Sequence, residues 1–186
     1  MLTMKGFWIF IIAVAVVGAG FVIWYISASN KLKAAKVKID ESRSGIDVAL
    51  TKRFDLLTKM LEITKGYAAY EKFTMIEAIK MRSGMPLSEC AEINGKLNEI
   101  AKAINVAVEA YPELKADRSF AALQATCADA EEHLSASRRA YNSNVSYYNQ
   151  LLVKFPTSAV ANGLGLRAEE FFTADEEKRE DVKMAF

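Results

Sequence analysis

The feature that most constrains this chain is an uncharged stretch near its start, GFWIFIIAVAVVGAGFVIWYI, which runs from Gly6 to Ile26. An α-helix of that length covers about 30 Å, the thickness of the hydrocarbon core of a bilayer. Trp8 lies near one end of the stretch, and Trp24 and Tyr25 lie near the other. Indole and phenol rings favour the headgroup level of a membrane. The pattern therefore predicts a single membrane-spanning helix.

The alternative is a cleaved signal peptide, for which Ser27-Ala28-Ser29 could provide the cleavage site. Signal peptides usually have a basic start and an apolar core of only about 7–15 residues. Here the core is longer and only Lys5 precedes it, which favours a retained anchor.

The flanking charges predict the orientation of this anchor. Four lysines follow the stretch, namely Lys31, Lys33, Lys36 and Lys38. No acidic residue occurs there before Asp40, so the positive-inside rule predicts an external amino terminus and a cytoplasmic remainder. The same lysines are candidates for contact with lipid headgroups, although they could serve only to fix the topology.

The composition of the remainder limits its organisation. A formal net charge of +1 argues against bulk nucleic-acid binding. About 160 residues follow the apolar stretch, enough for one cored domain. We therefore expect a membrane helix in residues 1–28, a cytoplasmic bundle in 29–175 and an acidic tail in 176–186. Cys90 and Cys127 fall in helical patterns, which favours free thiols in a reducing compartment.

Apolar residues recur at helical spacing in three segments, and no strand-like alternation is present. The first stripe is Ile46, Leu50, Phe54, Leu57 and Leu61, and the second is Ile93, Leu97, Ile100, Ile104 and Val108. The third is a coiled-coil-like seam at positions 120, 123, 127, 130, 134, 137, 141, 144, 148, 151 and 155. The pattern predicts an all-α protein whose three long helices form an elongated antiparallel bundle, with short helices added.

Prolines and glycines predict where these helices end. Pro112 closes the second long helix, and Pro156 stops the third, which is expected over about 118–155. A short helical piece around Phe73, Ile76 and Ile79 is expected to end at a glycine cap and proline stop in Gly84-Met85-Pro86. A final amphipathic piece is expected over about 159–175. Because no proline lies between Met1 and Pro86, the membrane helix is expected to continue into the bundle as one helix of about 60 residues.

The search for catalytic chemistry finds no site. His133 is the single histidine, and neither it nor its helical neighbours supply the several ligands that a metal needs. Neither G-x-x-x-x-G-K-[ST] nor G-x-G-x-x-G occurs. We therefore expect no catalytic residues, no metal, no cofactor and no enzymatic activity.

Tyrosine–asparagine pairs are the most unusual feature of the third helix. Tyr141-Asn142 and Tyr148-Asn149 repeat at seven-residue spacing, with Asn144 between them. Buried amides and hydroxyls need hydrogen-bond partners, which Arg53 and Asp55 on a facing helix are expected to supply. These contacts could fix the helix register, as a seam asparagine does, or they could line a groove for a ligand or protein partner.

Several motifs resemble the signature of the LemA family over roughly residues 34–172. They are Lys52-Arg53-Phe54-Asp55-Leu56-Leu57, Lys65-Gly66-Tyr67-Ala68, Glu71, Glu109-Ala110-Tyr111-Pro112-Glu113-Leu114-Lys115-Ala116, Phe120, Leu123-Gln124, Glu131, Arg138-Arg139, both Tyr-Asn pairs, Phe155-Pro156 and Phe171. The chain departs from the family pattern at Thr58-Lys59, where Pro-Asn is usual, and at Tyr70, near the usual His-Glu step. The missing proline favours a continuous first helix.

The resemblance implies a bacterial inner-membrane protein with a cytoplasmic helical bundle and no established enzymatic activity. It also suggests a role in membrane organisation, because a relative takes part in forming magnetosome membranes. We expect a self-associating, membrane-anchored scaffold. Ala15, Gly18, Ala19 and Gly20 offer small residues for close helix contact in lipid. The alternative is an adaptor that binds a signalling or quality-control protein through its Tyr/Asn residues.

Overall fold

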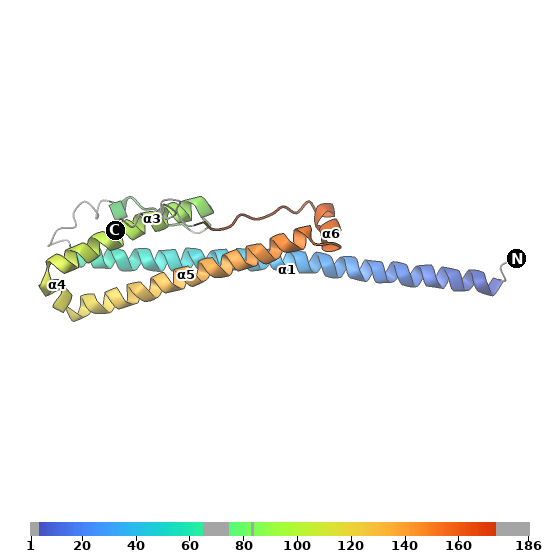
Figure 1. The fold of residues 1–186 in the computed structure, drawn as a ribbon, viewed down its shortest axis with the longest axis horizontal. Helices are drawn as coiled ribbons and strands as arrows, with labels where there is room; N and C mark the ends of the chain where they lie inside the picture. The colour runs from blue at the N-terminus through green and yellow to red at the C-terminus, as the bar shows by residue number, and fades with distance from the viewer. Residues whose placement is uncertain (1–3, 65–74, 83, 174–186) are drawn as a thin grey trace, which may run out of the picture. The chain divides into compact units, whose positions relative to one another are not determined.

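The computed structural model describes residues 4–64, 75–82 and 84–173, and these ranges are mainly helical (Figure 1). No strand occurs in them, which confirms the all-α prediction. The helices are α1 (Met4–Thr64), α3 (Leu87–Ala110), α4 (Pro112–Ala116), α5 (Arg118–Val153) and α6 (Thr157–Gly163).

Helix α1 is a single uninterrupted helix of 61 residues. Its continuity past Leu57 confirms the prediction made from the missing proline. The hydroxyl of Thr58 donates to the carbonyl oxygen of Phe54 at 2.8 Å, so this polar side chain is accommodated within the helical ladder. The apolar stretch and the first bundle stripe therefore belong to one element.

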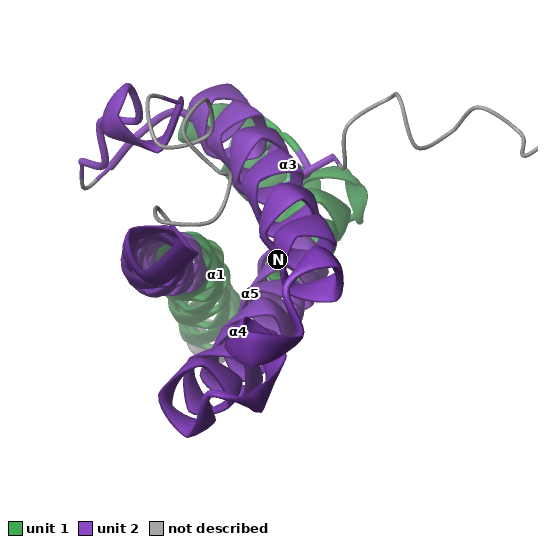
Figure 2. Cartoon of the chain, turned by 90° about the vertical axis from the view of Figure 1, so that its left-hand side faces the viewer, with its two compact units in different colours: residues 1–39, 144–170 green, residues 40–143, 171–186 purple. Residues whose placement is uncertain are grey.

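The chain forms two compact units, which are coloured separately in Figure 2. Unit 1 comprises residues 1–39 and 144–170, and unit 2 comprises residues 40–143 and 171–186. Helices α1 and α5 each contribute to both units, and each unit is described below by itself.

In unit 1, α5 packs antiparallel against α1 (Figure 1). The side-chain amide of Asn144 on α5 donates to the carbonyl oxygen of Lys38 on α1 at 3.2 Å. The buried side chains here are Ala28, Ser29, Leu32, Ala35 and Ile39 of α1, Val145, Tyr148 and Leu151 of α5, and Val160 and Ala161 of α6. One face of α1 is therefore covered from Ala28 onward.

In unit 2, the predicted stripes form the core. The whole α3 stripe is buried, as is the α1 stripe except for Phe54, which is half-buried. Helix α5 runs antiparallel to both, as predicted for it. Helices α1 and α3 run parallel to each other. Arg43 of α1 bonds Met85 just before α3, and the later Arg53 bonds the later Asn98, so the contacts move in the same direction along both segments.

Prolines and one aspartate set the helix ends. Pro112 is the first residue of α4, after α3 has ended at Ala110. The carboxylate of Asp117 accepts from the backbone N–H groups of Ser119 and Phe120 at 2.7 and 2.9 Å, so it caps the start of α5. Helix α5 ends at Val153, two residues short of the predicted end.

Phe155 is consequently an exception to the predicted seam. It lies outside the helix and is 86% exposed, whereas the other ten positions are buried or half-buried. A side chain beyond the last helical turn no longer follows the helical spacing that directs a seam inward.

Two connecting segments differ from the predictions. The described helical residues near Ile76 are only 75–77, so Gly84 caps no helix; it lies in a turn with a φ of +74°. Phe73 lies outside the described residues. The predicted helix over 159–175 is instead the short α6, which ends in a Schellman-type turn where Leu166 N–H donates to Ala161 at 3.1 Å. Residues 165–173 then run without helix and are called the strap below.

Candidate functional site

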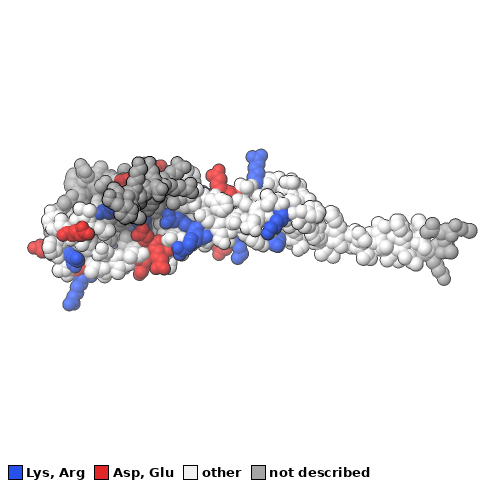
Figure 3. Space-filling view, in the orientation of Figure 1, with Lys and Arg blue, Asp and Glu red and all other residues white. Residues whose placement is uncertain are grey.

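The first part of α1 exposes a long row of apolar side chains. Val17 is 73% exposed, Ile23 69% and Trp8 62%. By length and composition this part of α1 is sufficient to cross a membrane. Its space-filling surface carries no charged side chain on the face shown in Figure 3. Such exposure is costly in water, at about 25 cal/mol per Å² of apolar surface, and large exposed apolar surfaces mark candidate membrane or protein contacts.

The exposed row ends abruptly. Ile26 is 53% exposed, whereas Ala28 is 6% exposed and Leu32 is fully buried. The change falls just after Trp24 and Tyr25, the residues predicted to mark one interface. The change from exposed apolar side chains to buried ones therefore takes place over two residues, from Ile26 to Ala28.

The predicted headgroup lysines follow this boundary. Lys31, Lys33 and Lys38 are exposed. Lys36 is half-buried and forms an ion pair with Glu169 of the strap. The structure therefore uses Lys36 to hold the strap, and leaves the exposed lysines as the better candidates for headgroup contact.

The paired asparagines bind the strap through its backbone. In unit 1, the Asn149 side chain donates to the carbonyl oxygen of Glu169 at 2.9 Å and accepts from its N–H at 3.0 Å. In unit 2, Asn142 makes the same pair of bonds with Phe172, at 3.0 and 2.8 Å. An amide side chain thus mimics the edge of a β-strand at each position, because it offers one donor and one acceptor side by side.

The two tyrosines of the repeat are core residues. Tyr141 and Tyr148 are each only 1% exposed. Burial raises the pKa of the Tyr148 hydroxyl above its usual value, with Lys36 opposing the rise and Glu169 adding to it. Near the other strap contact, the guanidinium of Arg138 lies 5.6 Å from the centre of the Phe172 ring, at the distance of a cation–π pair.

The predicted partners of the asparagines, Arg53 and Asp55, are not their partners in the structure. Asn142 and Asn149 bond the strap, and Asn144 bonds α1 backbone. Asp55 is exposed and lines a shallow groove of about 540 Å³ with residues of α1 and with Met81 and Arg82. The sequence could not reveal the strap, because an extended segment without alternation carries no periodic signal.

Arg53 instead forms a buried cluster within unit 2. Its Nη1 and Nη2 donate to the side-chain oxygens of Asn94 and Asn98 at 2.9 and 2.8 Å, and Nη2 lies 3.5 Å from Glu131. The Arg53 side chain is 2% exposed, and its Nε has no hydrogen-bond partner among the described residues. Asn94 and Asn98 lie one turn apart on α3, so both face the same guanidinium.

Asp47 forms a second polar cluster, which the sequence patterns did not predict. Its carboxylate accepts from the N–H of Gly84 at 2.9 Å and contacts the Cys90 thiol at 3.6 Å. Burial, aided by the Asp47 charge, raises the pKa of Cys90 to about 11, so this thiol stays protonated near neutral pH. Both cysteines are free, with Cys90 buried and Cys127 half-buried. The signal available in the sequence was weak: Asp47 directly follows Ile46 of the apolar stripe.

The described residues contain no group of three or more His, Cys, Asp or Glu side chains that could hold a metal ion. His133 is exposed and lines an open groove of about 360 Å³ with Lys52, Asp129 and Glu132. The polar groups that the structure does bring together hold helices to one another and hold the strap to α5.

Taken together, these features define a class: a helical bundle carried on the distal part of a helix whose first part is apolar and exposed. Comparison with known proteins is specific. The LemA family model matches residues 42–186, and the chain belongs to the LemA family. A protein LemA from Metamycoplasma hominis is 28% identical over 167 residues, which cover 87% of this chain and 76% of that relative.

Proposed function

We propose that this chain is a single-pass membrane anchor and scaffold, with α1 crossing the bacterial inner membrane and the bundle on its cytoplasmic side. The observation that carries the proposal is the continuity of α1. The helix whose first part is exposed and apolar is the same helix that supplies Ile46, Leu50 and Leu57 to the core of unit 2. One helix therefore connects the apolar part to the bundle core without an intervening Gly/Ser linker.

We further propose that the scaffold works as an assembly of several copies. Ala15, Gly18 and Ala19 share one helical face, and a Cβ added at Gly18 would meet nothing within 4 Å. Small residues let backbones approach closely in lipid, where helix association depends on packing rather than on the hydrophobic effect. Copies held in this way would order the surrounding membrane or gather other proteins on it.

The experiment compares Gly18→Ile with Ala13→Ile, which adds a comparable branched side chain on the opposite face. We expect light scattering in mild detergent and cross-linking in native membranes to show oligomers for the unmodified chain and for Ala13→Ile. Gly18→Ile should reduce the cross-linked fraction by about tenfold, equivalent to about 1.4 kcal/mol of association. A strictly monomeric unmodified chain without cross-links in membranes would contradict the proposal.

An adaptor that binds a partner through the Tyr/Asn residues is less well supported. The side-chain amides of Asn142 and Asn149 already bond the strap, so a partner would have to displace it. Tyr141 and Tyr148 are buried, so alanine there is expected to destabilise the bundle by about 3–5 kcal/mol rather than release a partner. Loss of a co-purified protein with helicity and thermal stability intact would favour the adaptor instead.

A further inference from the structure

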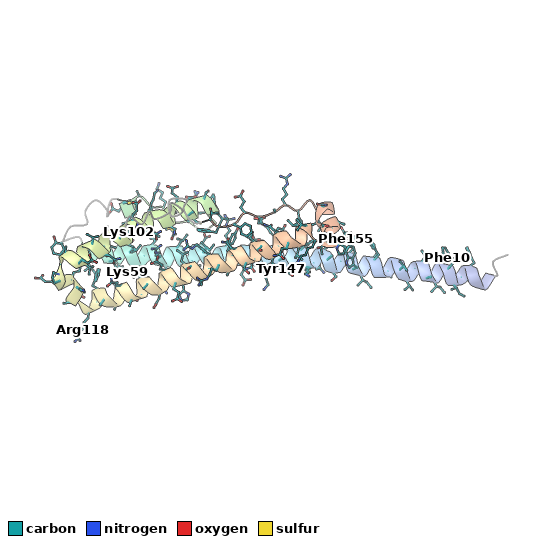
Figure 4. The ribbon with its side chains drawn as sticks, viewed as in Figure 1. Phe10, Lys59, Lys102, Arg118, Tyr147 and Phe155 are labelled. Carbon is teal, nitrogen blue, oxygen red and sulfur yellow. The ribbon has the colours of Figure 1, made fainter. Side chains whose placement is uncertain are left out.

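Apolar side chains are exposed at the corner between α5 and α6 in unit 1, whereas the apolar side chains on either side of the corner are buried. Phe155 is 86% exposed and Val153 is 77% exposed, and Leu164 after α6 is 37% exposed. Leu151 and Val160 on either side are buried, at 6% and 2%. Figure 4 labels Phe155 at this corner.

The register of α5 against α1 places this corner at the membrane boundary of α1. Asn144 bonds the carbonyl of Lys38, and the two helices are antiparallel. The nine steps along α5 from Asn144 to Val153 advance about 13.5 Å, which brings the end of α5 level with about residue 29 of α1. Exposure on α1 changes between Ile26 and Ala28, so the exposed corner and the end of the apolar row lie at the same level.

The charges around the corner suit a phospholipid surface. Residues 140–166 contain no acidic residue and a single basic one, Lys154. Residues 6–39 of α1 are also free of acidic residues and contain the four lysines that follow the apolar stretch. Glu169, a carboxylate of the same unit, is paired with Lys36, whereas Lys31 and Lys33 are exposed. An apolar tip that carries a lysine and no carboxylate of its own is attracted to anionic headgroups while its ring enters the acyl boundary.

We propose that the α5–α6 corner, residues 153–164 with Phe155 at its tip, is a second membrane contact that inserts into the interfacial layer of the bilayer crossed by α1. Its partner is phospholipid, with Val153 and Phe155 among the upper acyl chains and Lys154 at the phosphates. The inference rests on the proposed anchoring by α1. Two contacts fix the rotation of unit 1 about α1, which a single span leaves free.

The test uses one tryptophan as a depth probe in the full-length chain. Trp8→Phe and Trp24→Phe remove the native indoles, and Phe155→Trp introduces the probe at an exposed position that tolerates its size. The chain is reconstituted in vesicles of phosphatidylcholine and phosphatidylglycerol, with or without lipids brominated in the upper acyl chains. The matched control is Tyr147→Trp in the same background, because Tyr147 is also exposed on α5 but lies about 12 Å from position 155 along its axis.

We expect brominated lipid to reduce the emission of the probe at position 155 by about twofold and to leave the control nearly unchanged. Equal, weak quenching of both probes in chains that float with the vesicles would overturn the corner contact and leave the anchoring by α1 intact. A probe at position 155 that is unquenched but blue-shifted, and shifts red on dilution in detergent, would assign the corner to a second copy and also overturn it. A chain that does not float would overturn both proposals.

Discussion

At the scale of single residues, the bundle of unit 2 depends on polar side chains that are removed from water but hydrogen-bonded. Arg53 is the clearest example, because its guanidinium joins α1 to two asparagines of α3. Glu131 adds little stability, since it is 61% exposed and exposed ion pairs contribute about 0–1 kcal/mol. The hydrogen bonds to the two asparagines supply most of the stability at Arg53, because leaving a buried amide unpaired costs about 1–3 kcal/mol.

Replacing Arg53 by methionine should therefore lower the free energy of unfolding by about 2–4 kcal/mol. The measurement is thermal unfolding followed by circular dichroism in mild detergent. Arg139→Met is the control, because Arg139 is exposed and, among the residues that the structure describes, bonds Ser135 on its own helix alone; it should change stability by less than about 0.5 kcal/mol. Equal melting temperatures for the two variants would show that Arg53 is not a stabilising residue.

Cys90 gives the stability of unit 2 a specific pH dependence. Its pKa is raised by burial and by Asp47 from 9.0 to about 11, so folding favours the protonated thiol. The stabilisation is complete below pH 9 and is lost as pH rises from 9 to 11, at up to about 1.4 kcal/mol per pH unit. Between pH 8 and pH 10.5, the melting temperature should fall more for the unmodified chain than for Cys90→Ala. The comparison cancels the lysines that also titrate in this range; an identical fall in both chains would contradict the assignment.

At the scale of elements, the helices follow from the sequence and the strap does not. The α3 stripe is buried at every predicted position, because a 3.6-residue period can be read without knowing its neighbours. The predicted end of α5 was two residues too late, because a proline prevents the helix from continuing past it but does not determine where the helical hydrogen bonds stop. The strap depends on two asparagines, Asn142 and Asn149, that meet it only after the chain has turned at α6. Their spacing was visible in the sequence, but their partners were not, since a single amide pairs with any backbone group that reaches it.

The strap should loosen when either asparagine is removed. Asn149→Ala deletes both bonds to the backbone of Glu169, so the N–H of Glu169 loses its acceptor. We expect its hydrogen exchange to accelerate by about 10–100-fold, the equivalent of about 1–3 kcal/mol. Exchange is measured by mass spectrometry on peptides covering residues 165–173. Gln150→Ala is the control, since Gln150 is exposed and bonds Ser146 of α5 and Lys154 just after it rather than the strap. Unchanged strap exchange in Asn149→Ala would refute the holding role.

At the scale of the whole molecule, one helix carries both the proposed membrane span and part of the bundle core. The side on which the bundle lies then follows from the charges that flank the apolar row. Lys31, Lys33 and Lys38 are exposed beyond that row, whereas Lys36 is committed to Glu169. The positive-inside bias acts on the lysines and arginines that flank a span during insertion, so these lysines are the residues through which it can be changed.

Replacing Lys31, Lys33 and Lys38 by glutamine, together with Leu2→Arg and Thr3→Arg, should invert a substantial fraction of the molecules. Carboxyl-terminal fusions report the outcome: a green fluorescent protein fusion should lose fluorescence, and an alkaline phosphatase fusion should gain activity. The matched control replaces Lys59, Lys102 and Lys115, which are equally exposed but distant in sequence from the apolar row. It removes the same number of lysine charges, without the two added arginines, and should leave both signals unchanged, because the bias acts only within about 15–20 residues of a span. An unmodified chain whose phosphatase fusion is already active would place the bundle on the opposite side of the membrane and would remove the basis for a cytoplasmic scaffold.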